Sequence, residues 1–276
     1  MFSIIIPSFN NFEYLKLCIL SLEKNSSLKN ELIFYINEGS DGSLDFIKSK
    51  NYKFIHSKIN KGLCTAVNEA SKLANTNYIL YAHDDMYFLP EWDLVLKNEV
   101  NLLDTNLFYL SGTMINEGHI KLDCGKTFKD FDEKQLLLNY KKYNFYDFHA
   151  SFESPHLIHK SIWKKVRGLS EEFNPGDGSD PDLCMKLWKE GVRIFKGINH
   201  FKVYHFGSVT LRKKIFFKRN NGSLQFLKKW KISHKFFRKH YLKARTVYSG
   251  ALIEPNKNIF YYIELLLCKL KLYFSQ

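Results

Sequence analysis

Several features that would assign a chain to a class are absent from this sequence. Its five cysteines are odd in number and widely spaced, and none form a C-x-x-C pair, which argues against a disulfide framework or a cysteine metal site. No uninterrupted apolar run is long enough to span a bilayer. The amino terminus lacks a basic region followed by a long apolar segment and a cleavage site. We therefore expect free thiols and a cytoplasmic location.

Acidic residues are absent from residues 212–245, a segment that contains 13 lysines and arginines. The net charge of the whole chain is +13, so this segment accounts for nearly all of the excess positive charge. Such a block favours a polyanion, either anionic lipid headgroups or nucleic acid, although a solvated helix face would carry the same charges. Aromatic residues interleaved with the cations suit a membrane interface, and the segment has no recognised nucleic-acid-binding motif. An anionic membrane surface, at the inner face of the membrane, is the expected partner of 212–245, and nucleic acid is not favoured.

Internal repeats and low-complexity linkers are also absent, and the first part of the chain alternates strand patterns with helix patterns. Strands are expected at 2–6, 31–36, 53–56 and 78–82, and helices at 11–23, 61–73 and 91–103. This alternation predicts an α/β fold with a mostly parallel sheet and helices on both faces. After residue 103 strand and helix patterns no longer alternate regularly, and after residue 207 the composition becomes basic and aromatic. We expect a boundary there, followed by a mainly helical region at 208–276.

Polar motifs follow three of the expected strands. They are PSFN at 7–10, NEGSDGS at 37–43 and HDDM at 83–86. The carboxyl ends of parallel strands meet at one edge of a sheet, which is where open α/β sheets bind ligands. The carboxylates of Asp84 and Asp85 can present a divalent cation to a nucleotide diphosphate there, whereas an isolated pair of aspartates more often caps a helix.

Over residues 1–207 the chain resembles the family 2 glycosyltransferases of the GT-A fold. In that family a turn after the first strand, an acidic turn after the second, an Asn-rich helix start and an Asp-rich metal motif occur in this order. The resemblance implies one Rossmann-like sheet with a nucleotide-sugar-binding half at 1–115 and an acceptor half at 116–207. It also implies metal-assisted transfer of a sugar, with inversion, from a nucleotide sugar, expected to be UDP-linked. The acceptor would be a hydroxyl of a glycan or lipid-linked molecule in cell-surface polysaccharide or glycoconjugate synthesis, and the cofactor would be Mn²⁺ or Mg²⁺.

The resemblance carries over to individual residues of the donor half. Pro7, Ser8 and Phe9 fall where the first strand turns under the nucleotide, and Glu38 falls where an acid approaches the base or ribose. Asp41 is a second candidate for that acid, and an ordinary turn rich in Gly and Ser is the alternative.

The motif NKGLCTAVNEA at 60–70 matches the family's Asn-x-Gly helix start, with a later asparagine. By that resemblance Asn60 and Gly62 contact the donor. Gly62 would allow the backbone to approach the ligand closely, and a helix start favours negative charge. For the later asparagine, Asn68, the alternative to a role at this site is packing within the fold.

In the metal motif, the resemblance places Asp84 on the ribose or the metal and Asp85 on the metal that bridges the diphosphate. His83 stands where the family usually has its first Asp, which leaves the coordination shell open. In HFKVYHFGS at 200–208, His205 falls where many related enzymes have a histidine that completes the metal site. An imidazole suits that role, although a lone histidine is more often structural. His156 and His159 are expected to pack beneath the acceptor loop.

A second acidic cluster lies in FNPGDGSDPDLCMKLWKEG at 173–191, where a loop leads into a helix expected to begin near Pro181. Asp180 would cap this helix. The resemblance instead makes Asp180 the general base that deprotonates the acceptor hydroxyl. Asp177 is a substitute base, and Asp182 is expected to serve the helix dipole or to orient the acceptor.

Other functions remain as alternatives. A sugar nucleotidyltransferase would need a Gly-rich, basic loop near its first strand, and PSFNNFEYLK has none. A nucleic-acid-binding protein acting through the basic segment and a catalytically inactive sugar-binding relative are the others. At the carboxyl end, an apolar stripe with helical spacing is expected to pack on the catalytic domain. Its members are Ile259, Ile263, Leu266, Leu267, Leu270 and Phe274.

Overall fold

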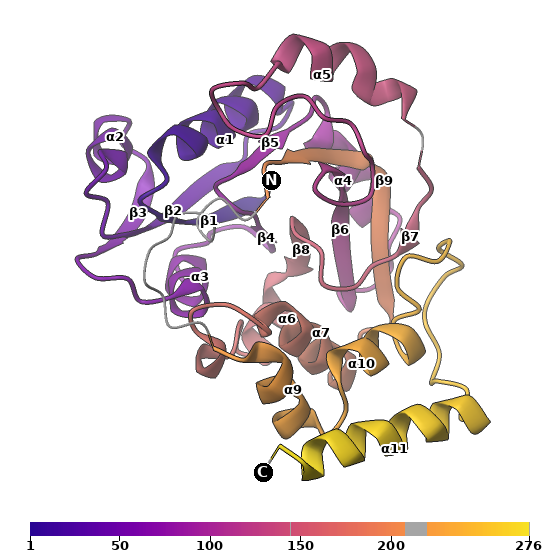
Figure 1. Ribbon diagram of the computed structural model, residues 1–276. Helices are drawn as coiled ribbons and strands as arrows, with labels where there is room; N and C mark the ends of the chain where they lie inside the picture. Colours follow the sequence, from indigo (N-terminus) through magenta and orange to yellow (C-terminus); the bar gives the residue numbers. More distant parts are fainter. Residues whose placement is uncertain (144, 208–219, 276) are drawn as a thin grey trace.

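The computed structural model describes residues 1–143, 145–207 and 220–275, and within them nine strands form one sheet (Figure 1). The strands are β1 Ser3–Phe9, β2 Glu31–Asn37, β3 Lys53–Ser57, β4 Tyr78–Tyr81, β5 Met86–Phe88, β6 Phe108–Asn116, β7 Phe148–His149, β8 His156–His159 and β9 Ile194–His205. Their order is β3-β2-β1-β4-β8-β6-β9-β5, and β7 pairs with β9.

Helices connect these strands and follow them. The α-helices are α1 Phe12–Asn25, α2 Ser43–Ser49, α3 Leu63–Ser71, α4 Trp92–Asn101, α5 Glu133–Asn139, α6 Lys160–Lys165, α7 Ser179–Lys189, α9 Gly222–Trp230, α10 His234–His240 and α11 Ile259–Tyr273. Two short 3₁₀ turns, η1 Tyr140–Lys142 and η2 Glu171–Phe173, complete the described elements.

The first four strands of the chain are parallel, as the sequence predicts. β1 lies between β2 and β4, and β3 pairs with β2 on the outer side. In this register Phe9 lies beside Asn37, and Asn37 beside Ser57. The polar motifs that follow these strands therefore leave the sheet at one edge.

The second part of the sheet is mixed rather than parallel. β8 runs antiparallel to both β4 and β6, and β5 and β7 run antiparallel to β9. β6 and β9 are parallel, but their register jumps from Gly112 beside Ile198 to Thr113 beside Lys202. Residues 199–201 are thus an insertion in β9 relative to β6, and β9 then continues to His205. β9 is therefore one continuous but irregular strand.

Apolar residues cover both faces of the sheet because strand side chains alternate between faces. In β1, Ile4 and Ile6 belong to a core formed with α1, α2 and α4, whereas Ile5 points into a second core formed with α3, α6 and α7. Phe226 and Phe237, from α9 and α10, belong to this second core. Helices α9 and α10 of the basic region are thus packed on the sheet's helices, and the division at residue 207 remains a prediction.

The last helix, α11, contacts α9 and α10 and projects along the lower end of the molecule (Figure 1). Its inward residues Tyr261 and Cys268 join Leu227 and Phe236 in a small separate core. In the described parts of the chain, no helix combines the length and apolar character needed to cross a bilayer. The first residues of the basic segment, 212–219, lie outside the described residues.

Candidate active site

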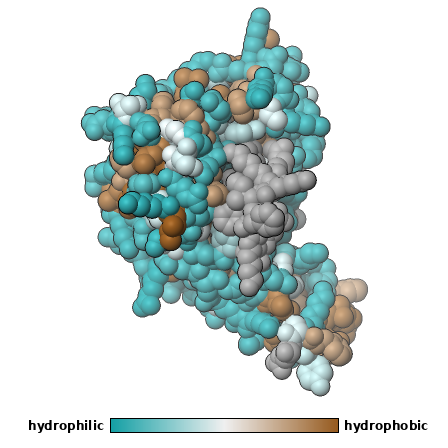
Figure 2. All heavy atoms as spheres, turned by 60° about the vertical axis from the view of Figure 1, so that its left-hand side comes forward, coloured by the Kyte–Doolittle hydropathy of each residue, from teal (hydrophilic) through white to brown (hydrophobic). Residues whose placement is uncertain are grey.

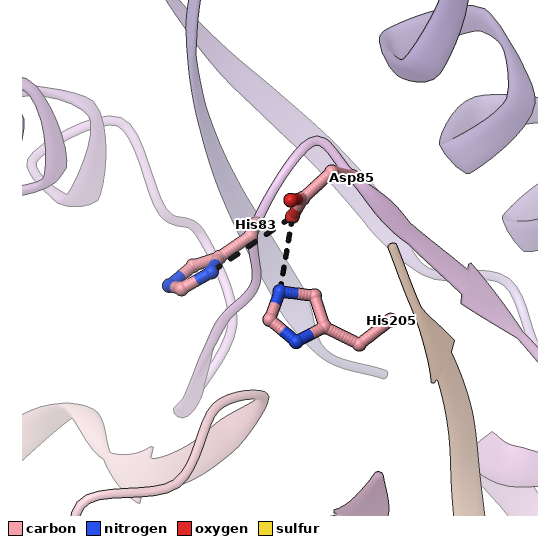
Figure 3. A group of neighbouring side chains, drawn as sticks. All are labelled: His83, Asp85 and His205. Carbon is pink, nitrogen blue, oxygen red and sulfur yellow. Dashed lines mark ion pairs between the residues drawn. The ribbon is translucent and has the colours of Figure 1, made fainter. Parts of the chain in front are cut away.

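Three side chains that can bind a metal converge at the ends of β4 and β9: His83, Asp85 and His205 (Figure 3). Asp85 lies between the two imidazoles. Its Oδ1 is 3.3 Å from Nε2 of His205 and 4.0 Å from Nδ1 of His83. One candidate ligand atom from each residue lies within 4.8 Å of the others, which is close enough for one ion to contact all three.

Strand pairing explains why residues so distant in sequence meet here. After β4 the chain turns through His83, Asp84 and Asp85 and enters β5, which pairs with β9 so that Met86 lies beside His205. The backbone N–H of Phe206 also donates a hydrogen bond to the carbonyl of Asp85, at 3.1 Å. The end of β9 is therefore fixed against the acidic turn.

The electrostatics of the two histidines differ. Burial lowers the pKa of His83 to about 4, against the opposing effect of Asp85, so His83 is neutral at physiological pH. Burial also opposes protonation of His205, but the hydrogen bond and charge of Asp85 outweigh it and raise the pKa of His205. Two imidazoles and a carboxylate form a donor set that suits a divalent transition metal.

The neighbouring carboxylate, Asp84, is buried and accepts a hydrogen bond from Nδ2 of Asn11, at 3.0 Å. Asn11 occupies the N-cap position of α1, but its side chain makes no capping hydrogen bond. Its amide is directed at Asp84 instead. The start of α1 is thereby tied to the metal-binding turn, a contact that the sequence does not indicate.

The first strand ends beside this turn. Ser8 lies in the Pro7–Phe9 stretch at the end of β1 and is 3% exposed, and among the described residues its hydroxyl has no hydrogen-bond partner. Glu38, at the end of β2, has a positive φ of 58°, and its carboxylate accepts a hydrogen bond from Asn10 at 3.1 Å. The predicted nucleotide-contacting residues of β1 and β2 are therefore adjacent.

Three other residues predicted to bind the donor hold local structure. Asp41 accepts hydrogen bonds from the backbone N–H of Phe12 at 2.7 Å and from the hydroxyl of Ser43 at 2.7 Å. Asn60 accepts one from the N–H of Gly62, at 2.8 Å. Gly62 has a φ of +83°, and a Cβ there would lie 2.4 Å from the Asn174 side chain. The close approach at Gly62 is to Asn174, so the predicted approach to a ligand stays a prediction.

Asp180 lies in the first turn of α7, but it is not the cap that the sequence predicts. The helix begins at Ser179, and its N-cap is Gly178. Burial, with a smaller contribution from the charge of Glu153, raises the pKa of Asp180 from 3.8 to about 7. One carboxylate oxygen is buried without a hydrogen-bond partner in the described part of the chain. A carboxyl group with these properties can exchange a proton near neutral pH.

Tyr81, the last residue of β4, lies near both acidic groups. Its pKa is raised well above 10, first by burial and then by the charges of surrounding acids that include Asp180, Asp84 and Asp85. Its ring lies 5.3 Å from that of His83, measured between centroids. Among the described residues its hydroxyl is buried without a hydrogen-bond partner. Asp180 and the acids of the metal-binding turn are therefore all close enough to Tyr81 to act on its hydroxyl.

Glu153 is a further buried acid of this region that sequence reasoning missed. Its carboxylate accepts hydrogen bonds from the N–H and hydroxyl of Ser151, at 2.6 and 2.9 Å. His119, Arg238 and Arg245 approach its Oε1 to 3.9, 3.8 and 3.9 Å. The two arginines come from the basic segment, so some of that segment's charge is directed at the catalytic domain.

The remaining candidates have structural partners. Asp182 is fully buried and binds Lys229 at 2.8 Å and the indole N–H of Trp230 at 2.8 Å, so it joins α7 to α9. Asp177 accepts from the N–H of Gly222 at 3.0 Å. Asn68 forms two hydrogen bonds with the backbone of Leu169, both at 2.8 Å, which confirms its packing role.

The histidines of β8 also have structural roles. His156 lies 3.2 Å from the hydroxyl of Tyr109, and burial lowers its pKa to about 3. His159 caps α6 by accepting from the N–H of Ser161. Both residues are therefore part of the packing around β8.

Solved structures with the same fold are glycosyltransferases. The chain matches a structure of S. aureus TarS, residues 1–349, at 17% identity and a TM-score of 0.53, over 74% of this chain and 60% of that one. The corresponding TarS complex with UDP-GlcNAc matches at 16% identity and 0.53, over 75% and 61%. The mannosyltransferase PcManGT from Pyrobaculum calidifontis, in complex with GDP-Man and Mn²⁺, matches at 14% identity and 0.52, over 74% and 56%.

The chain therefore spans about three fifths of the TarS fragment, and these likenesses establish the GT-A fold alone. No curated protein matches the sequence. A family model does: the model of glycosyl transferase family 2 matches residues 3–157, more than half of the chain. That range runs from β1 to the first residues of β8 and includes the acidic turn. The chain belongs to glycosyl transferase family 2.

Proposed function

We propose that this protein is an inverting glycosyltransferase that transfers a sugar from a nucleotide sugar to an acceptor hydroxyl. One observation carries the proposal: a group suited to metal binding and a carboxyl suited to proton transfer both lie near Tyr81. Family membership and the GT-A fold support the same conclusion. Neither group alone would distinguish this reaction from other nucleotide chemistry.

On the donor side, the nucleotide lies across the ends of β1 and β2, against Ser8 and Glu38. Asp84 contacts the ribose or the metal, and Asp85 and His205 hold the cation. Once bound, a divalent cation neutralises the charge that develops on the departing nucleotide diphosphate. Because the donor set includes two imidazole nitrogens, we favour Mn²⁺ over Mg²⁺, which prefers oxygen ligands.

On the acceptor side, Asp180 removes the proton of the attacking hydroxyl. The acceptor oxygen forms a bond to the anomeric carbon from the face opposite the diphosphate, and the bond from that carbon to the diphosphate oxygen breaks. The configuration at the anomeric carbon is therefore inverted. The pKa of Asp180, about 7, allows it to accept this proton at neutral pH.

The finer assignments are also proposals. A UDP sugar is favoured as donor because two of the TarS structures hold UDP or UDP-GlcNAc, whereas PcManGT holds GDP-Man. The acceptor is a glycan or lipid-linked molecule in cell-surface polysaccharide or glycoconjugate synthesis. The protein works at the inner membrane face, where the net positive charge of its carboxyl-terminal part, including 212–245, favours anionic lipids.

The test is a screen of UDP, GDP and dTDP sugars for thermal stabilisation with Mn²⁺, with Mg²⁺ and with a chelator, followed by assay of donor hydrolysis. We expect one nucleotide class to stabilise the protein in a metal-dependent way and to be hydrolysed slowly. Asp85→Asn should abolish both effects. Asp180→Asn should retain donor binding and lose transfer.

Different outcomes separate the alternatives. Donor binding without turnover under any condition would identify an inactive sugar-binding relative. Release of pyrophosphate from a nucleoside triphosphate and a sugar phosphate would identify a nucleotidyltransferase. Salt-sensitive binding of duplex DNA without any response to nucleotide sugars would place the function in the basic segment.

A further inference from the structure

Helix α11 exposes a broad apolar surface that nothing in the described chain covers. Only Tyr261 and Cys268 of this helix are buried. Its outward surface, called the α11 face below, consists of Ile259, Phe260, Tyr262, Ile263, Leu266, Leu267, Leu270, Tyr273 and Phe274, which are 44% to 81% exposed. Figure 2 shows apolar side chains gathered at the lower end of the molecule, where this helix lies.

The sequence predicts that the apolar stripe of α11 packs on the catalytic domain, but in the structure this stripe is exposed. All six residues of the expected stripe belong to the α11 face, and all six point to solvent. Since successive helix residues are about 100° apart, the face covers an arc of about 160°. Contiguous apolar surfaces of this kind mark sites of interaction with a protein or a membrane.

The charges around the α11 face favour an anionic occupant. Lys269 lies at one edge of the apolar arc and Lys271 at the other, and both are exposed. Residues 220–275 contain eleven lysines and arginines but only two acids. Lysines that flank an apolar helix face can bury their methylene stems while their ammonium groups reach lipid headgroups.

The same charges disfavour a second copy of the chain as occupant. A symmetric dimer through this helix would bring two basic regions together, and like charges would oppose the contact. The aromatic residues fit a membrane better. Phe260 and Tyr262 lie in the first turn of the helix and Tyr273 at its end, and such side chains are favoured at lipid–water interfaces.

We propose that α11 lies in the plane of an anionic membrane surface with the α11 face inserted among the lipids. The helix has 15 residues and is about 22 Å long, too short to span a bilayer and suited to lie at its surface. This assigns membrane contact mainly to α11 rather than to 212–245, whose described cations are partly paired with acids of the protein. It does not depend on the proposed sugar transfer.

The test is sedimentation of the purified full chain with vesicles of phosphatidylcholine, with and without phosphatidylglycerol. We expect binding to the anionic vesicles that weakens as salt is added. The double variant Ile263→Glu/Leu270→Glu should bind at least about tenfold more weakly, because two inserted apolar side chains are replaced by anions. Leu102→Glu/Leu138→Glu, which adds the same charge at exposed apolar positions just after α4 and within α5, should bind like the wild type.

A second pair of variants tests the charge. Lys269→Gln/Lys271→Gln should weaken binding to anionic vesicles, whereas Lys48→Gln/Lys50→Gln, at exposed positions of and after α2, should not. Circular dichroism and thermal midpoints establish that each variant is folded.

Two results would overturn the proposal. One is wild-type protein that stays in the supernatant with anionic vesicles. The other is a wild-type dimer, detected by sedimentation velocity, that dissociates in Ile263→Glu/Leu270→Glu although this variant binds vesicles as the wild type does. Donor hydrolysis in detergent-free solution should be unaffected by the α11 variants, so failure here is distinguishable from failure of the proposed function.

Discussion

Asn11 and Asp84 are 73 positions apart, and the Asn11 side-chain amide donates a buried hydrogen bond of 3.0 Å to the Asp84 carboxylate. The contact joins the first turn of α1 to the turn that carries Asp85. A hydrogen bond to a charged group is stronger than one between neutral groups. The orientation of the acidic turn is therefore set partly by a residue outside it.

Asn11→Ala should lower the affinity for nucleotide and metal together. Because the bond is charge-assisted, a loss of about 1.5 kcal/mol is expected, which corresponds to roughly tenfold weaker binding. Isothermal titration with the nucleoside diphosphate identified by the screen measures it. Asn25→Ala is the control: Asn25, in the last turn of α1, donates to the Phe88 carbonyl at 2.7 Å. Equal losses of affinity in both variants would mean that the effect is only on stability.

The rate of transfer should depend on the ionisation of Asp180. With a pKa of about 7, the carboxylate is the minor form at pH 5, and transfer there should be roughly a hundredth of its value at high pH. The measurement is kcat against pH at saturating donor and metal. Asp177→Asn, which changes an exposed acid of the preceding loop, should keep the same profile. A profile without a limb near pH 7 would remove Asp180 from the role of base.

The ionisation of Asp180 should also affect folding stability, which should fall as pH rises whereas the transfer rate increases. Between pH 3.8 and about 7 the native Asp180 binds a proton that the unfolded chain has lost, so stability falls as pH rises through this range. Asp180→Asn stays neutral and should be more stable than the wild type at pH 8, by on the order of 1 kcal/mol, and similar at pH 3. Chemical denaturation at the two pH values gives the comparison.

Glu153 should influence the base through its charge. Since that charge contributes to the raised pKa of Asp180, Glu153→Gln should move the acid limb of the kcat profile to lower pH. Glutamine keeps an oxygen that can accept from Ser151. At pH 6 the variant should retain a larger fraction of its maximal rate than the wild type, by a few-fold at most. Glu172→Gln, a change at an exposed acid, serves as control, and a shift in both variants would contradict a specific effect.

The ion pair between α7 and α9 should be important for stability. Asp182 is fully buried, and Asp182→Ala would remove the acceptor of the Trp230 indole N–H and one of the two partners of Lys229, at a cost of about 1–3 kcal/mol. Lys229→Met should also destabilise the protein. Lys228→Met, at the neighbouring exposed position, should change the unfolding free energy by less than about 0.5 kcal/mol. Urea titrations of the three variants test the order.

The sequence predicts the first half of the fold well because local signals decide it. β1, β2 and β3 are apolar runs followed by polar turns, and their parallel pairing follows from the helices between them. The short strands β5, β7 and β8 have no such signal, because each forms by pairing with a strand distant in sequence. The mixed part of the sheet therefore emerges only from tertiary pairing.

The residues of the candidate site also divide into those that the sequence predicts and those that only the structure reveals. Asp85, His205 and Asp180 could be named because family motifs mark them. Tyr81 and Glu153 could not, because Tyr81 reads as an ordinary core residue of β4 and Glu153 follows no recognised motif. Asp182 has the helix position that the sequence predicts, yet its partners Lys229 and Trp230 lie beyond the expected boundary at residue 207. Contacts between distant segments decide these roles.

Because residues 199–201 are an insertion before the end of β9, the face on which His205 lies depends on whether the number of inserted residues is odd or even. Side chains of a strand alternate between the two faces, so removal of one residue there would direct the imidazole away from Asp85 unless the bulge absorbed the change. Removal of two would keep the face and shift the residue along the sheet. Anyone who grafts this strand into a related protein should therefore conserve the parity of its length before considering its composition.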